Sequence, residues 1–190
     1  MTVVGFLDVL LGRSRPIPPT LDALFGLPSA AVTLQVATGL RPTGVGSVAF
    51  KSAEGATFAA LREQAGELLA LDGGRFQAET DGYGFTWLVR STSPDDLSGL
   101  VADLHTVNST LADAGFGSAL LCTVVGFTDG THPVGLVYLY KRGSWYPFAP
   151  QGSEQRDTSL EMQVRSALEG ELQLETDLSR WFPVYGAPGL

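Results

Sequence analysis

The stretch from Ser93 to Tyr140 constrains the fold of this chain more than any other part of the sequence. It predicts a helix followed by two strands, Ser118–Phe127 and Pro133–Lys141, and the pair Asp129-Gly130 between them is typical of a β-hairpin turn. Both strands are apolar at consecutive positions, whereas a strand with one face in water alternates apolar and polar residues. We therefore expect both faces of this hairpin to be covered.

The helix of this stretch carries signals at both ends. The run Ser93–Asp96 predicts its start, with the serine as the cap, and Gly115 and Gly117 are expected to end it with positive φ angles. Two polar residues interrupt its apolar face, because Asn108 falls near the centre of that face and His105 falls at its edge. We expect the Asn108 amide to satisfy backbone groups of a neighbouring strand or loop; the alternative is a ligand contact.

The part of the chain before this stretch predicts a mixture of helix and strand. Thr20–Phe25 favours a short helix. Ala31–Thr38 favours a strand because its apolar residues alternate, although a serine and a glycine near its ends could cap a helix over the same residues. A loop is expected from Gly39 to Ser47, followed by a strand over Ser47–Lys51. The loop lacks the lysine of a phosphate-binding loop, which argues against nucleotide binding.

The other elements follow from apolar periodicity and turn residues. They are an amphipathic helix over Ala56–Leu71, a hairpin of Arg75–Thr80 and Tyr83–Arg90, an edge strand over Ser144–Ala149 and a third helix over Thr158–Gly170. Thr158 and Glu161 predict a capping box for the third helix. The tail Asp177–Leu190 is rich in large apolar residues and is expected to dock on the sheet. The order predicts an α+β fold, with a mostly antiparallel sheet built from successive ββα units.

Residues 1–19 are expected to stand apart from a single domain over residues 20–190. Val3–Gly12 predicts a short amphipathic helix that needs a surface on which to fold, with Phe6, Leu7 and Leu10 on its apolar side. That surface could be the core of this chain, a partner or a membrane. A proline-rich linker follows it.

Charge and composition exclude several classes of protein. A net charge of −8 and a pI of about 4.6 argue against general nucleic-acid binding, which requires clustered Lys and Arg. A single cysteine excludes an internal disulfide and a thiolate metal site. We find no signal peptide and no apolar run that approaches the roughly 18 residues of a membrane span, so the expected compartment is the cytoplasm.

The sequence contains no recognised catalytic motif. It has no HExxH, no paired cysteines and no G-x-S-x-G, so we assign no catalytic residue, metal or cofactor. The most site-like feature is a group of aromatic residues with two neighbouring cations, which either packs in the core or lines a binding groove. Its candidate binding residues are Tyr138, Tyr140, Lys141, Arg142 and Trp145. Further possible ligand contacts are Arg41, His105 and Asn108.

Several segments resemble PspAB, an actinobacterial family of PspA-associated proteins. The matching segments are GFLDVLLGR, LDALFGLPSAAVTLQ, RPTGVGSVAF, YGFTWLV, PDDLSGLVADLHTVN, AGFGSALLC, VYLYKRGSWYPFAP and DLSRWFPVYGAPGL. The resemblance implies a cytoplasmic accessory of the phage-shock envelope-stress response, and it implies no enzyme activity or cofactor. The predicted architecture is also similar to small secretion-chaperone-like α+β domains that bind partner segments.

These observations predict a non-enzymatic adaptor that binds PspA or another phage-shock component. The N-terminal segment could add a peripheral membrane contact, and a homodimer could form through the remaining sheet face or edge. The alternative is a small-molecule-binding domain or enzyme that uses the Arg41 loop or the strip from Tyr140 to Trp145.

Overall fold

The computed structural model describes residues 21–51, 76–82, 84–152 and 154–190. The predicted helix over Ala56–Leu71 and the N-terminal segment with Phe6, Leu7 and Leu10 lie outside these residues. The helical elements are η1 (Leu21–Gly26), α2 (Leu27–Thr38), α4 (Leu97–Leu111), η2 (Ala112–Phe116), α5 (Thr158–Leu168) and η3 (Leu178–Arg180). The strands are β1 (Arg41–Lys51), β2 (Phe76–Thr80), β3 (Phe85–Ser91), β4 (Leu120–Thr128), β5 (Pro133–Leu139), β6 (Ser144–Phe148), β7 (Pro150–Gln151) and β8 (Gln155–Arg156).

Six strands form one sheet in the order β2-β3-β1-β4-β5-β6, and every neighbouring pair is antiparallel. A second, two-stranded sheet pairs β7 with β8. The predicted α+β class is therefore confirmed, as are the hairpins β2–β3 and β4–β5. The ββα repeat is not confirmed, because the described chain begins helix then strand where a strand pair was expected.

The prediction of a strand over Ala31–Thr38 was wrong, because these residues belong to α2. Gly39 ends this helix with a φ of 79°, and its N–H donates to the Gln35 carbonyl at 2.9 Å. The buried residues recur at helical spacing, while the valines that suggested a strand point to solvent. The buried set is Leu27, Ala30, Ala31 and Leu34.

The predicted loop from Gly39 to Ser47 was also wrong, because most of it belongs to β1, which lies between β3 and β4. Its glycines allow close packing. A Cβ on Gly46 would lie 2.7 Å from Leu104 of α4, so the absent side chain lets the helix approach the strand. Gly44 has a φ of 80°, and a Cβ there would lie 2.4 Å from the Thr92 carbonyl oxygen.

Both predicted helix caps are replaced by a neighbouring aspartate. Asp96, rather than Ser93, caps α4, since its side chain accepts from the Gly99 N–H at 3.0 Å. Asp157 caps α5 in the same way, and Glu161 is buried elsewhere instead of closing a capping box. At the other end of α4, Gly115 has the expected positive φ of 90°, whereas Gly117 keeps a φ of −54°.

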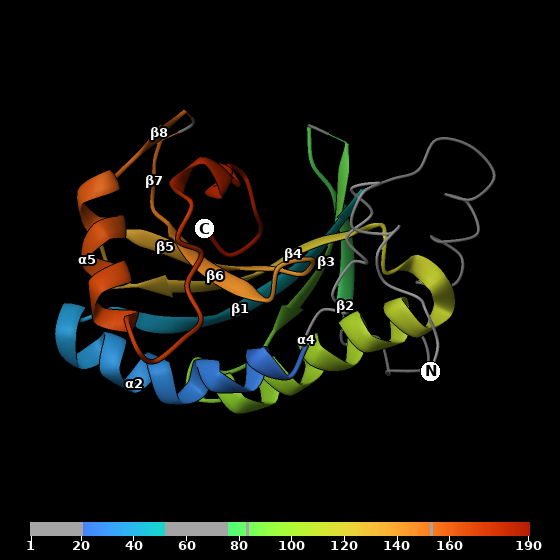
Figure 1. Cartoon of the computed structure of the whole chain (residues 1–190), viewed down its shortest axis with the longest axis horizontal. Helices are drawn as coiled ribbons and strands as arrows, with labels where there is room; N and C mark the ends of the chain where they lie inside the picture. The colour runs from blue at the N-terminus through green and yellow to red at the C-terminus, as the bar shows by residue number, and fades with distance from the viewer. Residues whose placement is uncertain (1–20, 52–75, 83, 153) are drawn as a thin grey trace, which may run out of the picture.

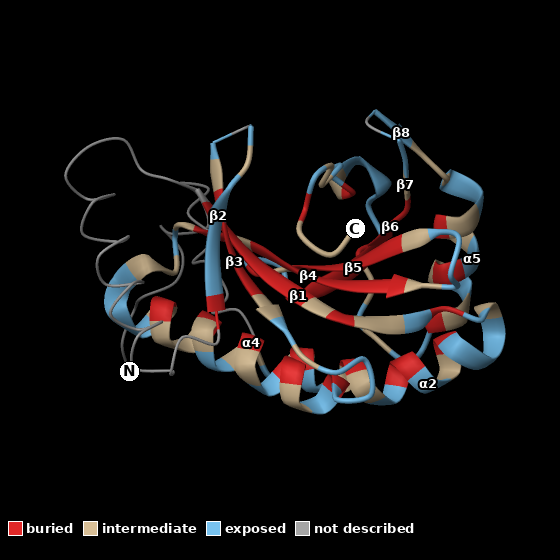
Figure 2. Ribbon diagram, turned by 180° about the vertical axis from the view of Figure 1, so that it is seen from behind, coloured by how far each residue is buried: buried red, intermediate tan, exposed pale blue. Residues whose placement is uncertain are grey.

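The sheet lies between the helices and the C-terminal segment (Figure 1), and a hydrophobic cluster packs on each of its faces. On one face, helices α2, α4 and α5 pack against the strands and form the larger cluster with them. Figure 2 shows the buried sides of these helices turned toward the strands. The C-terminal segment covers part of the other face, where Trp181 and Ala187 are buried. The expectation that both faces of the central hairpin are covered is thus confirmed.

A bulge redistributes the side chains of β4 between these faces. The register against β1 shifts between Ala49, which pairs with Cys122, and Phe50, which pairs with Leu120. Leu120 therefore faces the helices, whereas Leu121 and Cys122 both face the C-terminal segment. A regular strand would place Leu120 and Cys122 on the same face, so the bulge separates them.

Residues Leu21–Thr38 are long and apolar enough to span a membrane by length and composition alone, so the expectation that no apolar run approaches that length was wrong. Core helices of globular proteins also meet this criterion. Here the segment packs on β1, α4 and α5 through a buried side that begins at Leu24 and ends at Leu34. We therefore interpret it as a core helix.

Candidate functional site

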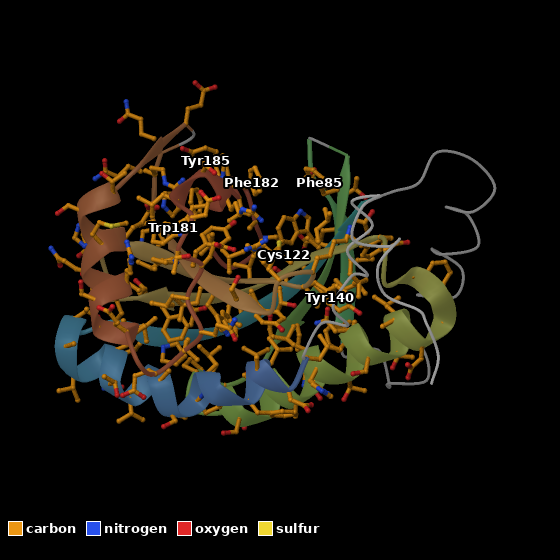
Figure 3. All side chains as sticks on the ribbon, in the orientation of Figure 1. Phe85, Cys122, Tyr140, Trp181, Phe182 and Tyr185 are labelled. Carbon is orange, nitrogen blue, oxygen red and sulfur yellow. The ribbon has the colours of Figure 1, made fainter. Side chains whose placement is uncertain are left out.

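A cleft of about 490 Å³ opens on the face of the sheet that the C-terminal segment covers only in part. Strands β1, β3, β4 and β5 form its floor, and residues 180–184 form one wall. Figure 3 shows Cys122 at the sheet, with Phe182 and Phe85 above it in this view. Among the described residues it is lined by Ala49, Phe85, Trp87, Leu121, Cys122, Leu139, Lys141, Arg142, Tyr146, Arg180, Phe182, Pro183 and Val184.

A smaller cavity of about 290 Å³ continues this cleft toward the turn between β2 and β3. The two share Phe85, Trp87, Pro183 and Val184, so they form one groove between the hairpin and the C-terminal segment. Asp81 lies at this end, where its carboxylate accepts from the indole N–H of Trp87 and the backbone N–H of Phe85, both at 2.9 Å.

Two aromatic residues fix the C-terminal wall of the cleft. The Tyr146 hydroxyl donates to the Phe182 carbonyl at 2.8 Å, and the Trp181 indole N–H donates to the Glu175 carbonyl at 3.1 Å. The rings of Tyr146 and Trp181 stack with centroids 5.8 Å apart. The Phe182 side chain remains 61% exposed at the rim, so it adds apolar surface that the fold itself leaves uncovered.

Arg156 joins this wall to α5. It donates through Nη1 to the Trp181 carbonyl at 2.8 Å and through Nε to both carboxylate oxygens of Glu161, at 2.8 and 3.0 Å. Glu161 also accepts from the Ala149 backbone N–H at 2.9 Å, and the guanidinium lies 5.1 Å from the Phe148 ring centroid. This charge-assisted network holds the C-terminal segment in one place.

Three cations, Lys141, Arg142 and Arg180, line the larger cavity but not the smaller one that contains Asp81. Arg142 bonds to the buried carboxylate of Glu175, and Arg180 bonds to Asp177 at 2.9 Å. Burial alone would raise the pKa of Glu175, but hydrogen bonds from the Asp177 backbone, Arg142 and Ser144 outweigh it and lower that pKa below its usual value. Glu175 therefore stays ionised at neutral pH.

The groups at the cleft floor are not set up for nucleophilic or acid–base chemistry. Burial raises the pKa of Cys122 to about 12, so its thiol stays protonated at neutral pH. Burial also raises the pKa of Tyr146, whose hydroxyl is already engaged by Phe182. The thiol therefore behaves as a small apolar side chain.

The strand alternation divides the predicted aromatic strip between the two faces of the sheet. Tyr138 and Trp145 are fully buried under the helices, with ring centroids 5.0 Å apart, and Tyr140 belongs to the same cluster (Figure 3). These three residues are unavailable to a partner. Only Lys141 and Arg142 of the predicted set reach the cleft, where both are exposed.

The other predicted ligand contacts have structural partners or lie apart. The Asn108 amide is buried and paired inside the fold, but not with backbone groups of a neighbouring strand or loop as expected. It donates to the Leu104 carbonyl of its own helix at 2.8 Å and to the Thr123 side-chain hydroxyl at 3.0 Å. His105 packs against a phenylalanine ring of η1, and its Nε2 lies 3.4 Å from an Asp22 oxygen. Arg41 is exposed at the start of β1 and lines none of the cavities described here.

A second surface of interest is the outer side of η1 and α2. Phe25, Val32 and Val36 are 50, 65 and 85% exposed, and their spacing of seven and four residues places them on one side of the helical rod. The sequence has no charged residue between Asp22 and Arg41. Large apolar side chains are thus presented to solvent on an uncharged helical surface.

The model of one family, PspA associated protein B, matches residues 4–189. The chain belongs to this family. No curated protein matches the chain, and neither does any solved structure.

In this member of the PspA associated protein B family, sequence reasoning missed most of the cleft. Trp87 and Leu121 were assigned to strands without a role, and Phe182 was expected to be buried with the tail. One sequence signal for the wall of the cleft was nevertheless present in Asp177–Leu190, where a basic residue lies directly before two large aromatic residues. For the outer side of η1 and α2 the signal was the large apolar residue that directly follows a buried one, as Phe25 follows Leu24 and Val32 follows Ala31.

Proposed function

We propose that this chain is a non-enzymatic accessory protein that associates with PspA through the outer side of η1 and α2. The family description supports the partner, since it names proteins associated with PspA. The exposed apolar residues Phe25, Val32 and Val36 support the surface and are the observation that carries the proposal. The setting would be an envelope-stress system in the cytoplasm or at the inner side of the cell membrane.

A protein partner suits this surface better than a bilayer does. Helices that lie on membranes usually combine an apolar side with Lys and Arg, which anionic lipids attract. Here the segment from Ala23 to Leu40 contains neither, and the whole chain carries a net charge of −8. A helix of the partner could instead pack its own apolar side against Val32 and Val36. Backbone groups within a helix are already hydrogen-bonded to each other, so this contact would bury side chains without leaving backbone groups unpaired.

The structure supports a homodimer through the sheet less well than it supports a contact through η1 and α2. The C-terminal segment already covers part of the face opposite the helices. Residues Gln173 and Glu175 bond to Trp145, so they also cover part of the outer edge of β6. Self-association through η1 and α2 is therefore the competing use of the proposed surface, and the experiment below separates the two.

Calorimetric titration of the purified chain with its cognate PspA tests the proposal. Val36→Glu places a charge in the proposed contact at an exposed position, and we expect it to weaken association at least tenfold. Ser98→Glu is the matched control, because it adds the same charge at an exposed position of α4. Circular dichroism verifies that both variants fold.

Absence of binding by the folded wild-type chain would contradict the proposal. Equal affinities of Val36→Glu and wild type would also contradict it, because the partner would then bind elsewhere. Light scattering shows whether Val36→Glu instead separates two copies of this chain.

A further inference from the structure

We propose that the cleft between the sheet and residues 180–184 binds a single long acyl chain that ends in a carboxylate. The ligand class is a fatty-acid anion. Its hydrocarbon chain would lie along the groove toward the β2–β3 turn, and its carboxylate would lie beside Lys141, Arg142 and Arg180. This inference concerns a different surface from the proposed PspA contact.

The lining of the cleft favours a hydrocarbon chain over a peptide. A peptide brings one N–H and one C=O per residue, and each needs a hydrogen-bond partner once it leaves water. The described lining away from the cations consists of aliphatic and aromatic side chains with the thiol of Cys122 and the hydroxyl of Tyr146. That hydroxyl already donates to Phe182, and the thiol is a weak hydrogen-bonding group. An acyl chain has no such groups to satisfy.

The charges around the cleft favour an anionic head group. Three of the 12 basic residues of an acidic chain gather at this one end, and no carboxylate is among the described residues that line the larger cavity. Arg142 and Arg180 hold structural carboxylates on one side, yet both still line the cleft. Lys141 is exposed, and no carboxylate among the described residues forms an ion pair with its ammonium.

The dimensions favour one chain. A volume of about 490 Å³ lies within the range of about 300–1,000 Å³ that is typical of small-molecule sites. The smaller cavity shares Phe85 and Trp87 with the larger one and continues the groove toward Asp81. Asp81 at the far end repels a carboxylate, so the two ends of the groove set the direction of the ligand.

A chain-length series tests the hydrocarbon part of the inference. Calorimetry with octanoate, decanoate, laurate and myristate, each below its critical micelle concentration, should show affinity that rises about fourfold per buried methylene. The gain should stop at the length that fills the groove. Dodecyltrimethylammonium has the chain of laurate with a cationic head, and we expect it to bind at least tenfold more weakly.

Two variants locate the site. Lys141→Glu should weaken laurate binding at least tenfold, whereas the control Arg41→Glu makes the same charge change at the far end of β1 and should leave it unchanged. Ala49→Phe should block the groove, since Ala49 lies on its floor. If that variant does not fold, protection of Cys122 provides a second measurement in the wild type, because bound laurate should slow alkylation of this floor residue.

Several results would overturn the inference. They are no saturable laurate binding, equal binding of the cationic amphiphile, unchanged affinity in Lys141→Glu, and no protection of Cys122 by bound laurate. Preferential binding of an apolar peptide with a free C-terminal carboxylate would also overturn it. Because Val36→Glu leaves the cleft intact, that variant should bind laurate normally, so failure of this inference and failure of PspA association are distinguishable.

Discussion

Replacement of Trp181 by alanine should measure how much the C-terminal segment contributes to stability. Trp181 is only 5% exposed, stacks on Tyr146, and donates its indole N–H to the Glu175 carbonyl. Removal of a buried Trp side chain typically costs about 3–5 kcal/mol, which includes the cavity left behind. The lost hydrogen bond adds about 1 kcal/mol, so we expect a value toward the upper end of that range.

Urea unfolding of the full chain provides the assay. The expected loss is a large part of the roughly 5–15 kcal/mol that stabilises a typical domain, and it corresponds to a fall in melting temperature of roughly 6–20 °C. Phe182→Ala is the matched control, since this neighbouring aromatic side chain is mostly exposed and its carbonyl bond to Tyr146 survives the substitution. We expect that control to change stability by no more than about 0.5 kcal/mol.

A loss below about 1 kcal/mol in Trp181→Ala would refute this reasoning. It would mean that the segment contributes little to the fold and that the second face of the sheet is stable without it. Equal effects of the two substitutions would refute it as well, because burial would then not decide the outcome.

Three other perturbations follow from single residues. Asn108→Ala should destabilise the chain by about 1–3 kcal/mol in urea, because it leaves the buried Thr123 hydroxyl without its amide donor; a neutral result would contradict the internal pairing. Cys122 should react with iodoacetamide at pH 8 far more slowly when folded than in urea, since burial raises its pKa to about 12; equal rates would contradict its burial. The Asp129 carboxylate raises the pKa of His132, so the contribution of this pair is present below the usual His pKa of about 6.5 and is lost as pH rises through the raised value. Asp129→Asn should return that pKa toward its usual value in an NMR titration, and an unchanged pKa would contradict the assigned contact.

Local sequence signals predicted the hairpins because their turns are decided locally. Asp81-Gly82 and Asp129-Gly130 lie between β-rich runs, and both turns formed where expected. The error at α2 arose because two patterns overlap in the same residues. Val32, Leu34 and Val36 alternate as in a strand, but the helical spacing of Leu27 and Leu34 decides the outcome, because it buries them against β1, α4 and α5.

The cleft depends on contacts between distant parts of the chain, which explains why it was not predicted. Its floor requires the bulge that turns Leu121 and Cys122 to the same face, and a bulge arises from the register between β1 and β4. Its wall requires the C-terminal segment to cross the sheet at Gly126, where a Cβ would lie 2.6 Å from the Gly189 carbonyl oxygen. Neither the register shift nor the path of the C-terminal segment can be predicted from local periodicity.

Hydrogen–deuterium exchange of this chain with and without its cognate PspA most directly tests the proposed association. We predict that PspA slows exchange in η1 and α2 around Val32 and Val36 and leaves strands β3 and β4 at the cleft unchanged. Protection confined to the cleft, or no protection anywhere in a mixture shown to be folded, would contradict the proposal that the outer side of α2 is the partner-binding surface.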